Sequence, residues 1–220
     1  MDALLLIDIQ NSFLPGGVLA VPRGDLVIPV ANRLMPLFEE ILATQDWHPP
    51  NHQSFAAMHP GKAVGEVIDL HGLPQTLWPA HCVQHSFGAA LADKLNKESI
   101  KQVFRKGVDP RIDSYSGFFD NGRGQATGLE EYLRQRKISK LYVVGLATDY
   151  CVKFTVLDAL HLGFETTVIV DGCRGIDLQP GQVKAALEQM RAAGAELIES
   201  STLIAARHTK KARPAHVLTQ

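Results

Sequence analysis

The stretch LYVVGLATDYCVKFTVLDALHLG, residues 141–163, contains the pattern that decides the fold class. An apolar run at 141–144 leads into a glycine-containing loop at 145–149, and a helical pattern at 150–162 then ends before Gly163. Glycine directly after a helical pattern is a frequent helix terminator. A short apolar run followed by a loop and a helix is typical of parallel α/β proteins, so this stretch predicts that class.

Similar apolar runs occur along the whole chain. The six candidate strands are 3–7, 41–43, 100–104, 141–144, 166–170 and 196–198. The helical patterns lie near 25–39, 88–97, 128–136, 150–162 and 181–193. The span 46–87 is rich in proline and has little periodicity, and such a long loop in a compact domain usually has a function. We predict one α/β domain at 1–204 and a flexible, solvated C-terminal tail at 205–220, where an apolar period is missing.

Composition and charge exclude several classes of function. A length of 220 residues with 45% hydrophobic content fits one compact domain. A net charge of −1 gives no field that attracts polyanions or acidic membranes, so the expected partner is a small molecule and not a nucleic acid or a membrane. The first apolar run stops at Asp8 and is too short for a secretory signal or a membrane span. The three cysteines are too few for a disulfide framework, and the expected location is the cytoplasm.

Four reactive side chains, Asp8, Asp46, Lys106 and Cys151, each follow a different apolar run. Open parallel sheets bind ligands at the carboxyl ends of their strands, so we expect these side chains to meet at one edge. Cys151 begins a helical pattern and has Lys106 as a nearby cation, which favours a thiolate nucleophile. Asp8 would carry the proton between the thiol and a leaving amine. The N–H groups of Ala147 and Cys151 would stabilise an oxyanion.

The alternative for Cys151 is a structural role, because an isolated cysteine is more often a buried apolar residue than a nucleophile. The presence of Asp8 and Lys106 favours catalysis in this chain.

A second group, Asp46, His48 and His81, predicts a metal site. Asp46 and His48 stand two residues apart, and in extended backbone such side chains project to the same side. His81 lies in the same proline-rich loop and is the expected third ligand. Two imidazoles and one carboxylate leave coordination positions open, as in a catalytic site; zinc is the expected ion, with iron and manganese as alternatives. Ser54, His52 and water stay open as further ligands.

The motifs around these residues resemble those of the nicotinamidases, or pyrazinamidases, within the isochorismatase-like cysteine hydrolases. The similar region runs from about residue 3 to 204 and includes LLIDIQNSF, TQDWHP, WPAHCVQ, RKG, SYSGFFDNG and GLATDYCVKFT. The resemblance implies a three-layer α/β/α sandwich with a six-stranded parallel sheet. It also implies a triad at Asp8, Lys106 and Cys151, a divalent metal on the Asp46 group, and a cis peptide between Leu146 and Ala147.

The resemblance further implies a reaction: hydrolysis of nicotinamide to nicotinate and ammonia through a cysteine thioester, as a step of NAD salvage. Pyrazinamide-type amides would be further substrates. The ring nitrogen would face the metal, with Phe13 and Trp78 flanking the ring. Core packing stays open for these two aromatics, and it is favoured for the further candidates Tyr115, Phe118 and Phe119.

Other functions stay open from the sequence. A metal-bound water could be the nucleophile and Cys151 structural, as in zinc hydrolases. The protein could instead bind nicotinamide-like ligands without catalysis, or use Cys151 as a redox sensor. Another hydrolase or amidase of the isochorismatase family is the nearest rival, although isochorismatases do not need the Asp/His/His group. The oligomeric state is not decided, and a homo-oligomer stays open.

Overall fold

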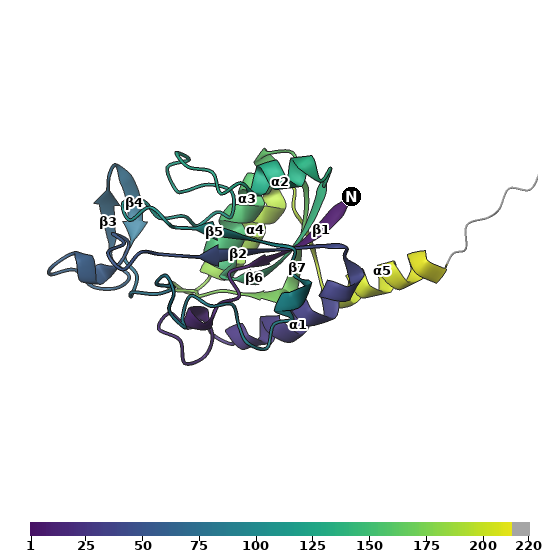
Figure 1. The fold of residues 1–220 in the computed structure, drawn as a ribbon, viewed down its shortest axis with the longest axis horizontal. Helices are drawn as coiled ribbons and strands as arrows, with labels where there is room; N and C mark the ends of the chain where they lie inside the picture. Colours follow the sequence, from purple (N-terminus) through teal and green to yellow (C-terminus); the bar gives the residue numbers. More distant parts are fainter. Residues whose placement is uncertain (213–220) are drawn as a thin grey trace, which may run out of the picture.

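The computed structural model describes residues 1–212, and its centre is a six-stranded sheet in which neighbouring strands are parallel (Figure 1). In spatial order the strands are β5 (Gln102–Lys106), β2 (Glu40–Asp46), β1 (Asp2–Ile7), β6 (Lys140–Leu146), β7 (Glu165–Arg174) and β8 (Glu196–Ile198). All six strands predicted from the sequence are present. A separate antiparallel hairpin, β3 (Val67–Leu70) and β4 (Leu73–Thr76), lies within the predicted long loop, beyond the carboxyl ends of the central strands (Figure 1).

The central strand β1 shows why the sheet is covered on both faces. Leu4 and Leu6 belong to one apolar core, whereas Leu5 and Ile7 belong to the other, because successive side chains of a strand point to opposite faces. A strand buried on both faces reads as the continuous apolar run seen in the sequence.

Helices form the two outer layers. They are α1 (Val27–Leu34), α2 (Leu129–Gln135), α3 (Lys153–His161), α4 (Gln182–Ala192) and α5 (Ser200–Ala212). Residues of α1 and α5 pack into one core, and residues of α2, α3 and α4 pack into the other (Figure 1). The three-layer α/β/α sandwich that the resemblance implied is therefore confirmed.

The helix predicted near 88–97 is wrong. The segment consists of turns, with only a short 3₁₀ helix at Lys97–Ser99. Its backbone groups are used elsewhere: the carbonyls of Gly88 and Ala90 accept the N–H groups of Ser12 and Asn11. Because these carbonyls pair with the segment after β1, they do not enter a helical ladder.

The tail predicted from residue 205 is also partly wrong, because α5 continues to Ala212. Arg207 forms an ion pair with Asp2, and its guanidinium lies 4.7 Å from the ring centroid of Phe38 and 5.5 Å from that of Tyr142. These contacts hold the helix against the sheet layer. The remainder of the predicted tail, 213–220, lies outside the described residues.

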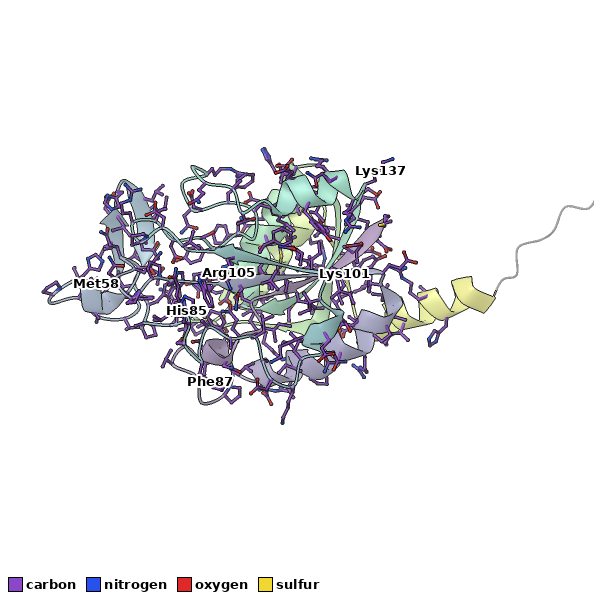
Figure 2. The ribbon with its side chains drawn as sticks, viewed as in Figure 1. Met58, His85, Phe87, Lys101, Arg105 and Lys137 are labelled. Atoms are coloured by element: carbon purple, nitrogen blue, oxygen red, sulfur yellow. The ribbon has the colours of Figure 1, made fainter. Side chains whose placement is uncertain are left out.

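Strand β5 forms one of the two edges of the sheet. Its exposed side chain Arg105, and Lys101 just before the strand, lie along this edge (Figure 2). Charged side chains on an edge strand disfavour pairing with another sheet. Within residues 1–212, the structure has no helix that combines the length and apolar character needed to cross a membrane.

Candidate active site

The predicted reactive residues lie at the carboxyl ends of four adjacent strands. Asp8 follows β1, Cys151 follows β6 after a short turn, and Asp46 and Lys106 are the last residues of β2 and β5. Asp46 and Lys106 are directly opposite each other in the strand register. The sheet topology therefore brings together residues that are far apart in the sequence, as the strand-end rule predicts.

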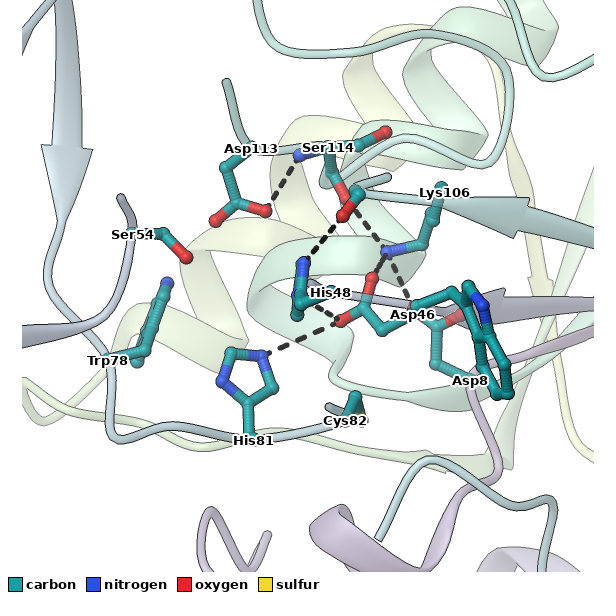
Figure 3. A network of polar contacts seen from close by, with 12 residues as sticks. Asp8, Asp46, His48, Ser54, Trp78, His81, Cys82, Lys106, Asp113 and Ser114 are labelled. Carbon is teal, nitrogen blue, oxygen red and sulfur yellow. Dashed lines mark hydrogen bonds and ion pairs between the residues drawn. The ribbon is translucent and has the colours of Figure 1, made fainter. Parts of the chain in front are cut away.

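Lys106 lies at the centre of this group (Figure 3). Its ammonium nitrogen donates to Asp46 Oδ1 at 2.5 Å, to the carbonyl of Ser114 at 2.8 Å and to Cys151 Sγ at 3.4 Å, and lies 2.9 Å from Asp8 Oδ2. The side chains of Lys106 and Asp8 are fully buried. Asp8, Lys106 and Cys151 are thus in contact, which is the arrangement that the proposed triad requires.

Asp8 has one engaged and one unengaged carboxylate oxygen. Oδ1 accepts a hydrogen bond from Thr44 Oγ1 at 2.6 Å. Oδ2 forms an ion pair with the Lys106 ammonium, and within residues 1–212 it has no hydrogen-bond partner. Burial raises the pKa of Asp8 above its ordinary value, although the Lys106 cation opposes this. A carboxylate with a raised pKa and a free oxygen is suited to accepting and returning a proton.

Cys151 differs from its predicted state. Burial raises the pKa of the Cys151 thiol well above its usual range, Lys106 opposes the shift, and Asp8 and Asp46 add to it. The thiolate expected from the helix terminus is therefore wrong for the resting protein. Burial outweighs the cation, so the thiol is neutral and must lose its proton when it reacts.

Asp46, His48 and His81 form a second group beside the first (Figure 3). The Nδ1 atoms of His48 and His81 donate to the carbonyls of Gly107 and Pro79, at 2.9 and 2.8 Å. These partners assign the proton to Nδ1 and leave a lone pair on each Nε2. The two Nε2 atoms lie 3.6 and 3.7 Å from Asp46 Oδ2.

The electrostatics of this group fit a cation. Nε2 of His48 is buried, and no residue that the structure describes forms a hydrogen bond with it. Although burial opposes it, the Lys106 cation holds the pKa of Asp46 well below its usual range, so Asp46 stays a carboxylate. One candidate ligand atom from each residue lies within 4.8 Å of the others. Two imidazole lone pairs and one carboxylate at this spacing can hold a divalent metal ion.

The RKG motif also contributes to this group through Gly107. Its φ of +65° is in the left-handed region, and a Cβ atom there would lie 2.3 Å from Cε1 of His48. Only glycine allows the backbone to approach the imidazole so closely and to accept its Nδ1 proton.

The sequence left Ser54, His52 and water as candidates for a further metal ligand, and the contacts of His52 reduce this choice. Its Nδ1 lies 2.7 Å from Ser54 Oγ, and its Nε2 lies 3.3 Å from the carbonyl of Ile112. Burial lowers the pKa of His52 to about 4, so its ring is neutral. With both ring nitrogens engaged, His52 is not free to bind an ion in this arrangement, whereas the oxygen of Ser54 keeps its lone pairs.

Both groups border one pocket. Its lining comprises Phe13, Leu19, Asp46, Trp78, His81, Asp113, Tyr115, Ala147, Tyr150, Cys151 and Ile176. The predicted aromatics Phe13 and Trp78 therefore face the same space as the sulfur and the metal group. Of the further aromatic candidates, Tyr115 lines the pocket, whereas Phe118 and Phe119 pack with the core under α2 and α3. The peptide between Leu146 and Ala147 is cis, as the resemblance implied.

Sequence reasoning missed several residues of this pocket. Asp113 is buried and accepts hydrogen bonds from the side chain of Gln75 at 3.0 Å and the N–H of Ser114 at 2.7 Å. Ile176 reaches the pocket from the loop after β7. The strand-end rule could have suggested Ile176, because β7 ends at the same edge of the sheet. No pattern in the sequence points to Asp113.

Comparisons with known proteins agree with this geometry. An isochorismatase domain model matches residues 2–202. The nicotinamidase of Escherichia coli (strain K12) is 55% identical over 199 residues, which cover 89% of this chain and 93% of the relative. A solved nicotinamidase and pyrazinamidase of Acinetobacter baumanii is 47% identical, with a TM-score of 0.89 over 92% of this chain and 97% of that chain. The pyrazinamidase of Pyrococcus horikoshii, solved in complex with zinc, is 35% identical, with a TM-score of 0.73 over 90% of this chain and 98% of that chain. The chain belongs to the isochorismatase domain family, within its group of nicotinamidases and pyrazinamidases.

Proposed function

We propose that this protein is a nicotinamidase, which hydrolyses nicotinamide to nicotinate and ammonia as a step of NAD salvage and also accepts pyrazinamide-type amides. One observation carries the proposal. Cys151, Lys106 and Asp8 are in contact, and the sulfur of this group faces a pocket that Asp46 and His81 also line. A nucleophile, a proton carrier and a metal group around one small aromatic-walled space match the needs of amide hydrolysis.

Each residue of the site has a separate role in the proposed reaction. Cys151 Sγ attacks the carboxamide carbon while its proton passes to the free Oδ2 of Asp8, and Lys106 stabilises the sulfur anion as it forms. The N–H groups of Ala147 and Cys151 stabilise the oxyanion. Asp8 then protonates the departing ammonia, which leaves a nicotinoyl thioester on Cys151. Water, deprotonated by Asp8, attacks the thioester, and nicotinate and the thiol are released.

Asp46, His48 and His81 would hold one divalent metal ion. We infer zinc, because the donor set suits it and the relative from P. horikoshii was solved with zinc; iron and manganese suit the same donors. The bound ion would supply a Lewis acid that holds the ring nitrogen of the substrate. Phe13 and Trp78 then fix the plane of the ring.

A second candidate is a metal-water hydrolase in which Cys151 is structural. It is favoured by the raised pKa of the buried thiol. The partner in both cases is a small aromatic amide. The three free cysteines, each buried, support a reducing cytoplasm as the location.

The test is ammonia release from nicotinamide by the purified protein, with and without a chelator, for wild type and Cys151→Ala. The thiol mechanism predicts release by the wild type and a loss on the order of 10⁴-fold or more for the variant. Turnover that survives the substitution would establish the metal-water mechanism. A wild type that releases no ammonia from nicotinamide, pyrazinamide or benzamide would contradict the proposed function.

A further inference from the structure

The loop after β7 forms one wall of the pocket through Ile176. It is packed tightly, because a Cβ atom on Gly175 would lie 2.2 Å from Val183 Cγ2 and 2.9 Å from Asp149 Oδ1. Asp177 adopts a φ of +53°, and its Oδ1 accepts the N–H of Val183 at the start of α4. Contacts with α4 and with the turn that contains Asp149 therefore hold this loop.

A second contact of the loop is made with the carboxylate of Asp149. Oδ1 accepts the N–H of Ile176 at 3.0 Å, and Oδ2 accepts the N–H of Asp177 at 2.7 Å. Asp149 is only 3% exposed, and within residues 1–212 no lysine or arginine forms an ion pair with it. The two loop amides are thus the hydrogen-bond donors that stabilise this buried charge.

Asp149 belongs to the π-helical turn Thr148–Val152, which presents Cys151 to the pocket. One carboxylate therefore connects the turn that holds the nucleophile to the loop that carries Ile176, another residue of the pocket lining. The position of Ile176 relative to Cys151 depends on this connection.

We propose that Asp149 is a positioning residue that sets the width of the substrate pocket between Cys151 and Ile176, and so limits the size of the aromatic ring that the pocket accepts. The role in turnover rests on the proposed amidase function. Without the carboxylate, the part-buried N–H groups of Ile176 and Asp177 lose their acceptor, and a movement of the loop towards water would give them new partners. Ile176 would move with the loop, and the pocket would widen.

The first variant is Asp149→Asn, which replaces one acceptor oxygen with an NH₂ group that faces a backbone N–H. The second is Gly175→Ala, which disturbs the same contact from the loop side and remains informative if the first variant does not fold. The matched control is Asp120→Asn, since Asp120 also accepts two consecutive backbone N–H groups, those of Gly124 and Gln125 at 2.8 Å, away from the pocket.

The measurement compares nicotinamide with quinoline-3-carboxamide, whose fused ring is wider. For metal-loaded protein we expect Asp149→Asn and Gly175→Ala to raise KM for nicotinamide about 10-fold, with a smaller change in kcat. The ratio of kcat/KM for the wide amide to that for nicotinamide should rise about 10-fold or more, and Asp120→Asn should leave it unchanged.

A binding experiment makes the same comparison. Each variant is combined with Cys151→Ala, and the dissociation constants of nicotinamide and quinoline-3-carboxamide are measured. The binding ratio should shift towards the wide amide in step with the kinetic ratio. If both amides weaken by the same factor, Asp149 has only a structural role and the proposal is wrong. If the wild type shows no ammonia release but the binding ratio still shifts, the proposed function fails while the role of Asp149 stands.

Discussion

Two charged groups share Asp46, and they differ in how completely the protein neutralises them. Around Lys106, one buried cation meets the carboxylates of Asp8 and Asp46. Around His48 and His81, two imidazole lone pairs face the remaining oxygen of Asp46, and Nε2 of His48 has no hydrogen-bond partner among residues 1–212. The first group is held by the protein alone, whereas the second fits an added cation. The structural role of the first and the metal dependence of the second can therefore be separated by mutation.

Breaking the Lys106 group should have the largest effect. Lys106→Ala leaves two buried carboxylates without their cation, so we expect the free energy of unfolding to fall by about 3–5 kcal/mol and ammonia release to be lost. The variant is compared with Lys97→Ala, which removes a surface ion pair with Asp93 and should cost about 1 kcal/mol or less. Urea denaturation measures both. Equal losses for the two lysines would contradict the structural role of the buried cation.

Breaking the histidine group should affect metal binding and not the fold. We expect His48→Ala to weaken zinc affinity by more than about 100-fold, since loss of a supporting contact alone has effects of up to that size. Elemental analysis and chelator competition measure the loss, and His71→Ala, which changes an exposed histidine outside the site, is the control. Metal content at the wild-type level would mean that the ligand assignment is wrong.

A smaller change is expected when Asp8 loses one hydrogen bond. Thr44 donates to Asp8 Oδ1 and lowers the pKa of Asp8, so Thr44→Val should raise that pKa further above its ordinary value. Asp8 must be ionised to accept the thiol proton, so activity is lost as the pH falls through this pKa. The acid limb of the kcat/KM profile should therefore move to higher pH, and Thr167→Val, on β7, should leave it in place. An acid limb that moves to lower pH would contradict the assignment of Asp8.

The smallest effect is expected far from the site, at Arg207. The Arg207 side chain is 26% exposed. It forms an ion pair with Asp2, and its guanidinium lies over the rings of Phe38 and Tyr142. Arg207→Ala should lower the free energy of unfolding by about 1 kcal/mol and leave kcat and KM unchanged. Thermal unfolding beside the ammonia assay tests this, and a change in KM would show that α5 is coupled to the pocket.

The sequence predicts the site residues that directly follow an apolar strand pattern. Asp8, Asp46, Lys106 and Cys151 could be placed together because each follows an apolar run, and parallel strands end at one edge. The ionisation of Cys151 could not be predicted, since it depends on how deeply the sulfur is buried.

Backbone contacts between segments far apart in the sequence could not be predicted either. The segment at 88–97 has a helical pattern, but its carbonyls pair with residues after β1, and a pattern of side chains carries no information on such pairing. The contact of Asp149 with Ile176 crosses from one strand end to another. Only the packed structure shows that a residue in the same turn as the nucleophile also holds the loop that carries Ile176.

The most direct test of the central claim is to trap the covalent intermediate. The wild-type protein is mixed with nicotinamide and quenched in acid during turnover, and the intact protein and its peptides are examined by mass spectrometry. We expect a mass increase equal to one nicotinoyl group, on the peptide that contains Cys151. A protein that turns over nicotinamide without any adduct, and whose Cys151→Ala variant remains active, would show that Cys151 is not the nucleophile.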